Sequence, residues 1–131
     1  MNNEQWAVKN EFEYAIARPF VMKENGIYKM WYSYREGKNI STYRIGYAES
    51  ADGMNWKRLD EKINMDVSER GWDSEMIEYS YLYDFKGKRY MLYNGNNYGK
   101  TGLGLAVLNE QWTMNNELLK MNLNMLLPVH L

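Results

Sequence analysis

Three carboxylates lie within six residues of one another near the middle of the chain: Asp73, Glu75 and Glu78. Trp72 precedes them, and an aromatic stretch, residues 79–83, follows directly. A carboxylic acid can protonate a glycosidic oxygen, and an aromatic ring can stack on the face of a sugar. These residue types at this spacing therefore predict a carbohydrate site. They also fit a solvated acidic loop that leads into a buried strand.

Two similar series of predicted strands flank this segment. Asn25-Gly26, Asp52-Gly53 and Lys86-Gly87 are turn signals that separate alternating apolar stretches. The first series consists of strands at 14–22, 27–34 and 43–49 and a fourth that Trp56 opens. The second consists of strands at 76–85, 88–94 and 102–108 and a possible fourth that Trp112 opens. Both faces of 27–34 are largely apolar, which predicts a sheet covered on both sides.

The two series are copies of one pattern. Residues 26–32 match 87–93, residues 45–48 match 103–106, and Trp56 matches Trp112. Four antiparallel strands repeated at this spacing are typical of β-propeller blades. We therefore expect an all-β fold of two four-stranded, propeller-like meander blades, which is an incomplete propeller. A single β-sandwich of seven or eight strands is the alternative.

We expect residues 1–131 to form one domain with three parts. The first blade-like repeat is predicted at 14–58, the second at 75–115, and a C-terminal tail at 116–131. Apolar residues in the tail recur at near-helical spacing before Pro128. The tail is either a docking helix or a divergent end that replaces strands, and the pattern leaves both open.

Composition excludes several kinds of function. The net charge of −1 gives no electrostatic footprint for nucleic acid or an anionic membrane, and the chain contains no transmembrane-length apolar run and no signal-peptide pattern. With no cysteine and one histidine, thiolate or histidine metal sites and a catalytic triad are not expected, so we predict neither a metal nor a cofactor. The default expectation is a cytoplasmic protein. Twelve tyrosines and five tryptophans against three phenylalanines favour strands with surfaces that can stack on sugars.

Several motifs occur in an order that resembles one family. They are 18–20 (Arg-Pro-Phe), the Ser50-x-Asp52-Gly53-x-x-Trp56 turn, 72–77 (Trp-Asp-Ser-Glu-Met-Ile), and 93–95 with 98–102. Together they resemble the five-bladed β-propellers of the glycoside hydrolase clan that includes arabinanases, β-xylosidases, invertases and levansucrases, and most closely its glycosidase-like members. The resemblance covers about residues 14–112.

The resemblance implies a site in a central funnel with three acidic residues: a base or nucleophile, a residue that tunes pKa, and a general acid. Glu75, which follows Trp72, is the favoured position for the acid, with Asp73 as its neighbour. Glu78 matches a second position through its spacing to Lys86-Gly87. On the same basis Arg18, Trp72, Tyr79, Tyr98 and Lys100 would bind the substrate. Arg18 would orient a carboxylate or bind sugar hydroxyls, burial beside Trp72 or Tyr79 would raise the pKa of the acid, and Tyr98 and Lys100 would line the rim.

The chain has the length of about two blades, and it shows no counterpart of the family's first-blade aspartate. Open blades leave edge strands and apolar faces that favour association. We therefore expect a homo-oligomer, most simply a dimer, with carbohydrate as the other partner and no nucleic acid or membrane. The predicted activity is cleavage of a glycosidic bond with Glu75 as general acid. A non-catalytic carbohydrate-binding or self-assembling module is the alternative.

Overall fold

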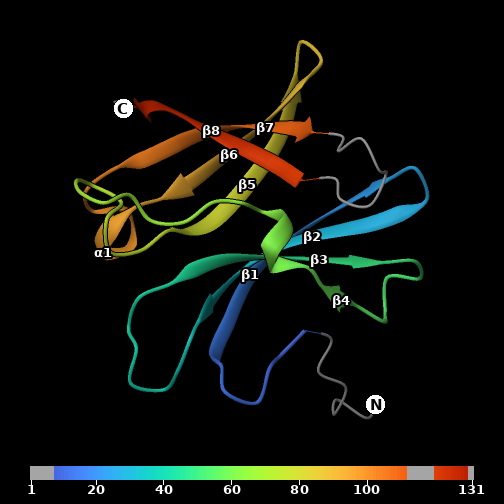
Figure 1. The fold of residues 1–131 in the computed structure, drawn as a ribbon, viewed down its shortest axis with the longest axis horizontal. Coiled ribbons are helices and arrows are strands. Elements are labelled where there is room, and N and C mark those ends of the chain that lie inside the picture. The colour runs from blue at the N-terminus through green and yellow to red at the C-terminus, as the bar shows by residue number, and fades with distance from the viewer. Residues whose placement is uncertain (1–7, 112–119, 130–131) are drawn as a thin grey trace.

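The computed structural model describes residues 8–111 and 120–129, which form two four-stranded antiparallel sheets (Figure 1). The strand orders are β1-β2-β3-β4 and β5-β6-β7-β8, so each sheet is a simple meander. The first sheet contains β1 (Tyr14–Glu24), β2 (Ile27–Arg35), β3 (Arg44–Ser50) and β4 (Lys57–Arg58). The second contains β5 (Glu78–Phe85), β6 (Lys88–Asn94), β7 (Leu103–Gln111) and β8 (Lys120–Val129). The predicted all-β class is confirmed.

Two-residue turns close the first hairpin of each sheet, as the sequence predicts. Asn25 and Gly26 both have positive φ, and Lys86 and Gly87 repeat this conformation between β5 and β6. Two positive φ values in succession are the geometry of a type I′ turn, whose twist matches that of the flanking strands. The sequence signals at these turns therefore set the strand register.

Asp52 organises the turn between β3 and β4. Its Oδ1 accepts hydrogen bonds from the backbone N–H groups of Met54 and Asn55 at 2.9 and 2.8 Å, and from the Ser50 hydroxyl at 3.0 Å. These donors stabilise the ionised carboxylate and hold the pKa of Asp52 well below its usual range. The predicted Asp-Gly turn is confirmed.

Apolar side chains from both sheets meet in one core. Trp31, Ile45 and Tyr47 of the first sheet pack with Ile77, which precedes β5, and with residues of the second sheet, which are Leu82, Met91, Tyr93, Ala106 and Leu108. The opposite face of the first sheet buries Met30, Tyr32 and Ala48 against Val8, Ile16, Tyr34 and Trp56. The prediction that β2 is covered on both faces is therefore confirmed.

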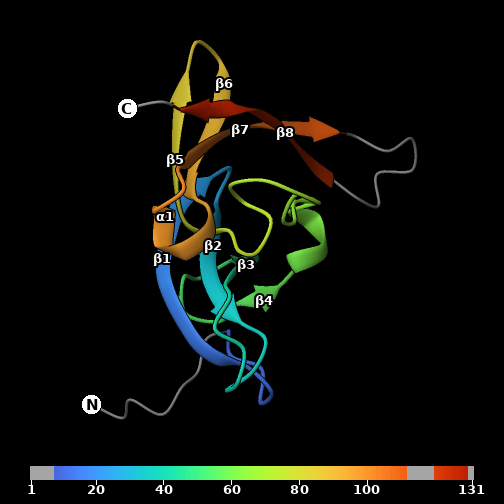
Figure 2. The same ribbon diagram turned by 90° about the vertical axis from the view of Figure 1, so that its left-hand side faces the viewer.

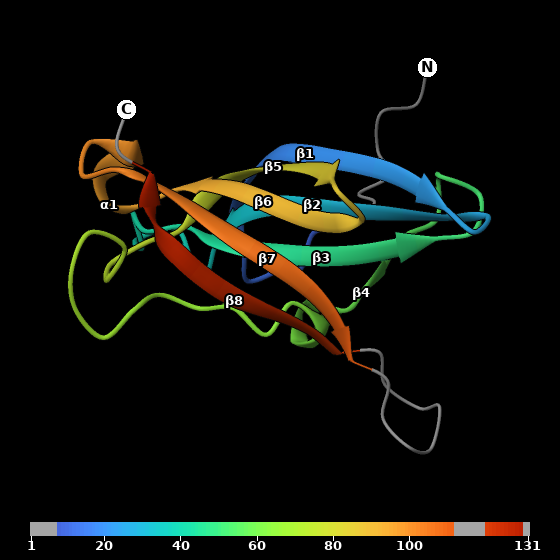
Figure 3. The same ribbon diagram turned by 90° about the horizontal axis from the view of Figure 1, so that it is seen from above.

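β5 lies against β1, β2 and β3, which places the first strand of the second sheet on the first sheet (Figure 3). Glu24 and Arg89 tie the sheets together near the end of β1, with Arg89 Nη1 at 2.8 Å from Glu24 Oε2. Lys29 also pairs with Glu24, at 2.7 Å. Because these cations favour its charged form, the pKa of Glu24 falls to about 2.

The segment between the sheets is not all loop. It contains a single 3₁₀ turn, η1 (Asp60–Lys62), which lies between the two sheets in Figure 2. β5 begins at Glu78, two residues later than predicted. The reason is that the N–H groups of Met76 and Ile77 donate to Asn96 Oδ1 and to the Tyr43 carbonyl instead of to β6.

The fourth strand of the second sheet is β8, which falls within the predicted tail and pairs with β7. The helical interpretation of the tail is therefore wrong. Residues 121–125 alternate methionine or leucine with asparagine, which is a strand period. Trp112, predicted to open this strand, lies outside the described residues. Among residues 8–111 and 120–129, no helix has the length and apolar character needed to cross a membrane.

Candidate active site

Glu78, the first residue of β5, carries a carboxyl group that is fully buried. Neither of its two oxygens has a hydrogen-bond partner within the described chain. Burial without a partner disfavours the ionised form and raises the pKa of Glu78 to about 7, with the Arg18 cation opposing part of that rise. A carboxyl group with this pKa can hold and release a proton at neutral pH, as a general acid must.

Two hydrogen bonds to acceptors in β2 and just before β3 fix the backbone on either side of Glu78. The Ile77 N–H donates to the Tyr43 carbonyl at 3.1 Å, and the Tyr79 N–H donates to Ser33 Oγ at 2.8 Å. Tyr79 has a φ of +56°, and the β5–β6 register shifts between Glu78 and Tyr81. A bulge of this kind re-aims a side chain, and strained backbone of this kind concentrates at functional sites.

The corresponding strand of the first sheet is irregular at a similar place. Ala15 and Arg18 both have positive φ, and the β1–β2 register shifts twice between Tyr14 and Phe20. Positive φ is uncommon for residues with a side chain and costs energy. The first strand of each sheet, β1 and β5, thus departs from regular geometry, and Arg18 of β1 lies near the Glu78 carboxyl.

Three tyrosine rings form an aromatic cluster that includes Tyr79, the residue after Glu78. The Tyr43 ring lies 5.9 Å from that of Tyr79 and 6.2 Å from that of Tyr98, centroid to centroid. Tyr98 belongs to α1 (Asn96–Gly99), a short turn on the same side of the molecule as the starts of β3 and β5 (Figure 1). Tyr98 is 54% exposed, so its ring is open to a ligand.

Two arginines lie over these rings. The Arg18 guanidinium carbon is 5.0 Å from the centre of the Tyr79 ring. Arg35, the last residue of β2, is 4.8 Å from the Tyr14 ring and 5.4 Å from the Tyr43 ring. Sequence reasoning selected Arg18, Tyr79 and Tyr98 but not Arg35 or Tyr43. Arg35 and Tyr43 lie at the two ends of a polar loop in the sequence. The antiparallel pairing of β3 with β2 brings them next to each other.

The Trp72 and Asp73 side chains both contact Tyr93 of β6. The Trp72 ring lies 5.5 Å from that of Tyr93 and fills the space beside Gly95 and Gly104, where a Cβ atom would come within 2.5 Å of it. Asp73 is buried and accepts a hydrogen bond from the Tyr93 hydroxyl at 3.1 Å. Burial and the Asp73 charge raise the pKa of Tyr93.

Glu75 is exposed, and its backbone holds the loop. Its N–H donates to Asn96 Oδ1 at 2.7 Å, and its carbonyl accepts from Arg44 Nη1 at 3.0 Å. The buried Asn96 side chain also donates to the Gly71 carbonyl at 3.1 Å. Asn96 thus clamps the segment that leads to Glu78. Sequence reasoning missed it because one of several asparagines in a Gly- and Asn-rich loop carries no distinguishing signal.

The predicted site residues therefore fall into three groups. Arg18, Glu78, Tyr79 and Tyr98 lie together at the start of β5. Trp72 and Asp73 form a buried supporting layer. Glu75 and Lys100 are exposed, and Lys100 contributes a backbone N–H to the Asn97 carbonyl. Within the part of the chain that the structure describes, no group of three possible metal-ligating side chains converges.

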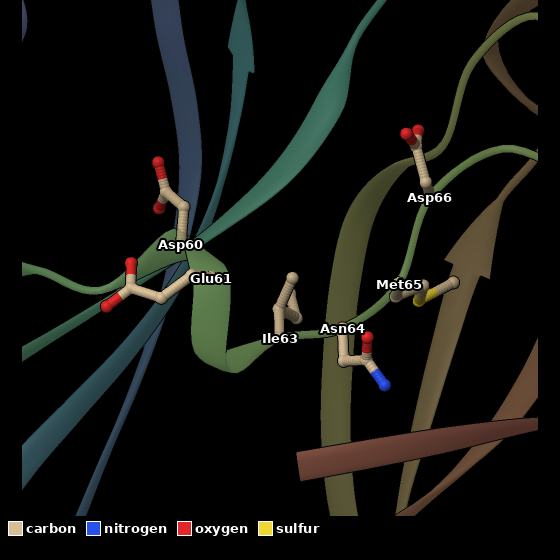
Figure 4. A pocket seen from close by; sticks show the side chains of 6 residues that line it. All are labelled: Asp60, Glu61, Ile63, Asn64, Met65 and Asp66. Atoms are coloured by element: carbon tan, nitrogen blue, oxygen red, sulfur yellow. The ribbon is translucent and has the colours of Figure 1, made fainter. Parts of the chain in front are cut away.

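An open cavity of about 290 Å³ lies elsewhere, along the segment that joins the two sheets (Figure 4). Asp60, Glu61, Ile63, Asn64, Met65 and Asp66 line it. Asp60 accepts from the Tyr32 hydroxyl at 2.6 Å and from the Tyr47 N–H at 2.8 Å, and it pairs with Arg58. This carboxylate is satisfied by its own neighbours, so it serves to hold the segment on the first sheet.

Comparison with known proteins gives matches to parts of longer chains. No family model matches the chain. Two curated proteins of Mycobacterium tuberculosis, uncharacterized protein Rv1502 (strain ATCC 25618 / H37Rv) and uncharacterized protein MT1551 (strain CDC 1551 / Oshkosh), are each 48% identical over 94 residues. The match covers 72% of this chain and 30% of each relative, so the chain spans less than a third of the relatives' length.

Among solved structures, a protein described as a glycoside hydrolase matches with a TM-score of 0.68 at 17% identity. The match covers 92% of this chain and 38% of that one. A structure described as a BT0996 RGII complex matches with a TM-score of 0.65 at 19% identity, covering 92% of this chain and 39% of that one. At these identities the likeness is one of fold.

Proposed function

We propose that this chain is a glycosidase-like protein that acts on carbohydrate, and that its two sheets are neighbouring blades of a β-propeller. Two successive four-stranded meanders joined by a single segment support the blade assignment. The fold shared with part of a glycoside hydrolase chain supports it as well. The two aromatic-rich inner strands and α1 would then face the centre of the propeller.

The proposed chemistry is proton donation by Glu78 to the oxygen of a glycosidic bond. The single observation that carries this is a fully buried carboxyl without a hydrogen-bond partner in the described chain, near the exposed Arg18 and the partly buried Tyr79. Such a carboxyl is protonated at a pH where exposed carboxyls are ionised. Glu75, favoured by sequence reasoning, is exposed, and its backbone is engaged in holding the loop. We therefore assign the acid role to Glu78.

Hydrolysis needs a second carboxyl, about 5–5.5 Å from the first for retention of configuration or about 6.5–9.5 Å for inversion. Of the charged side chains that the structure describes, Arg18 is the one that shifts the pKa of Glu78. We propose that a second copy of the chain contributes the other carboxyl, in a dimer formed through open blade faces. Light scattering tests this: a monomer at working concentration overturns the proposed assembly.

A carbohydrate-binding module without cleavage is the second candidate. One carboxyl near Arg18, together with the tyrosine cluster, supplies groups that can bind a sugar but not the pair of carboxyls that hydrolysis requires. Binding of glycans without turnover by the assembled protein would favour this candidate.

Turnover of a panel of aryl glycosides by the full chain and two variants tests the acid assignment. We expect Glu78→Gln to lower kcat by at least about a hundredfold on substrates whose leaving group needs protonation, because general acid catalysis contributes about 10²–10⁴-fold. Glu75→Gln, which removes a nearby exposed carboxylate, should retain activity. Loss of turnover in Glu75→Gln together with normal turnover in Glu78→Gln would overturn the assignment.

A further inference from the structure

Of the six arginines within residues 8–111, three form salt bridges, and Arg18, Arg35 and the exposed Arg70 form none. Arg44 pairs with Asp66, Arg58 with Glu13 and Asp60, and Arg89 with Glu24 and Asp84. Within residues 8–111 and 120–129, Arg18 and Arg35 make no ion pair and instead contact aromatic rings. Arg18 lies close enough to the buried Glu78 carboxyl to affect its pKa, and Arg35 lies in the neighbouring tyrosine cluster.

Arg35 is fixed in place with part of its hydrogen-bonding capacity unused. Its guanidinium stacks on Tyr14 and Tyr43, and its Nε is buried with no acceptor in the described part of the chain. An unsatisfied buried N–H is costly, so its persistence in a folded protein needs an explanation, such as a ligand. Stacking covers the face of the guanidinium, and its two Nη groups, which make no hydrogen bond to the described residues, remain as donors for a planar oxyanion.

The two arginines flank one aromatic surface. Arg18 lies over Tyr79, Arg35 lies over Tyr43, and the Tyr43 and Tyr79 rings are 5.9 Å apart. Arg18 comes from β1, Arg35 from the end of β2 and Tyr79 from β5, so the arrangement spans both sheets. Tyr43 is buried, and the exposed ring that packs against it is Tyr98, 6.2 Å away between centroids. An exposed ring in one cluster with two cations that form no salt bridge matches a sugar that carries a negative charge.

We propose that the site binds an anionic sugar, with the Arg35 and Arg18 cations attracting its oxyanion and the exposed Tyr98 ring taking the face of the pyranose or furanose. The oxyanion is the carboxylate of a uronic acid or, sharing the same chemistry, a phosphate. This inference rests on the proposed carbohydrate function but not on bond cleavage. An anion bound here would also offset the Arg18 charge, which opposes protonation of Glu78.

Isothermal titration calorimetry with matched sugars tests the proposal. The ligands are glucuronate and galacturonate, their neutral counterparts glucose and galactose, and inorganic phosphate alone. We expect the uronates to bind at least about tenfold more tightly than the neutral sugars, because one charge-assisted hydrogen-bond pair accounts for that factor. If phosphate binds while the uronates do not, the oxyanion is a phosphate. Equal binding of charged and neutral sugars, or binding of none of these ligands, overturns the proposal.

Variants that each remove one arginine charge distinguish binding at this site from non-specific attraction of an anion to the protein. Arg18→Gln and Arg35→Gln should each lower the uronate preference about tenfold or more. Arg70→Gln removes the same charge from an exposed residue outside the cluster and should leave the preference unchanged. Because Arg18 is exposed, Arg18→Gln keeps the test valid if Arg35→Gln fails to fold. A preference that survives Arg18→Gln, or that Arg70→Gln abolishes equally, counts against the proposal.

Glu78→Gln distinguishes this inference from the cleavage mechanism. That variant should lose turnover and keep the uronate preference, because the arginines are intact. If the wild-type chain never turns over any glycoside but still prefers anionic sugars, the cleavage proposal fails and the anion subsite stands.

Discussion

Replacing Glu78 by glutamine should change how the stability of the fold depends on pH. The pKa of this carboxyl rises from 4.5 to about 7 on folding, because it is buried without a partner in the described chain. Below pH 4.5 the group is protonated in both states and has no effect on the pH dependence. As the pH rises from 4.5 to 7, the unfolded chain ionises first, so unfolding becomes progressively more favourable. Above pH 7 both states are ionised and the penalty is complete.

The size of the effect follows from the two pKa values. A rise from 4.5 to about 7 corresponds to about 3 kcal/mol of free energy of unfolding, at about 1.4 kcal/mol per pKa unit. Glutamine does not titrate, so Glu78→Gln should remove this loss of stability. Any cost of burying the glutamine amide is independent of pH and shifts the whole curve without changing its shape.

Urea unfolding of the wild type and Glu78→Gln at pH 4.5, 5.5, 7 and 8 measures the difference directly. We expect the wild type to lose about 3 kcal/mol relative to the variant across this range, most of it below pH 7. Glu75→Gln, which changes an exposed carboxylate three residues away, should follow the wild type. Parallel curves for the wild type and Glu78→Gln would show that the carboxyl is not desolvated in the folded protein, and the acid assignment would lose its physical basis.

Three further variants test how the site is held. Gly104→Ala should lower the free energy of unfolding by about 1–3 kcal/mol, because the added Cβ would lie 2.5 Å from the Trp72 ring. Gly37→Ala is the control, because a Cβ there would have no neighbouring atom closer than 3.7 Å. Equal thermal stability of the two variants would show that close packing against Gly104 does not matter. Asn96→Ala should lower the free energy of unfolding by about 2 kcal/mol and should reduce turnover and sugar binding, because the side chain holds the segment before Glu78 by three hydrogen bonds. Unchanged turnover in kinetic assays and unchanged binding in calorimetry would rule out its positioning role. The ionised Glu24 carboxylate stabilises the wild type, and this stability is lost as the pH falls from 4.5 towards 2, which is opposite in sign to the effect of Glu78. Glu24→Gln should lack this stability and its loss on acidification. Denaturant unfolding in which the variant and the wild type lose equal stability over this pH range would contradict the prediction.

The hairpins were predictable from the sequence because their determinants are local. Asn25-Gly26 and Lys86-Gly87 specify turns by backbone conformation alone, and alternation of apolar residues on β2 specifies a strand covered on both faces. β8 was harder to predict from the sequence. Leu118, Leu119 and Leu126-Leu127 suggest a helical period, which hides the strict alternation of residues 121–125. In such a segment, pairing with a neighbouring strand decides between helix and strand.

The site was predictable in part, for a related reason. Sequence spacing placed a carboxylate near an aromatic strand, but Glu75 and Glu78 differ by burial, which depends on contacts from the other sheet. The Ser33 hydroxyl and the Tyr43 carbonyl that fix the backbone around Glu78 are more than thirty positions away in the chain. Arg35 was missed because its unpaired state is visible only when its neighbours in the fold are known.

The distribution of site residues over the two sheets bears on how much of the chain the site requires. Arg18, Arg35 and Tyr43 belong to the first sheet or its loops, and Glu78, Tyr79 and Tyr98 belong to the second sheet or its loops. Either sheet by itself would thus hold the two cations without the acid, or the acid without the two cations. The site needs both sheets and the segment that joins them, so a fragment that keeps one sheet loses the site.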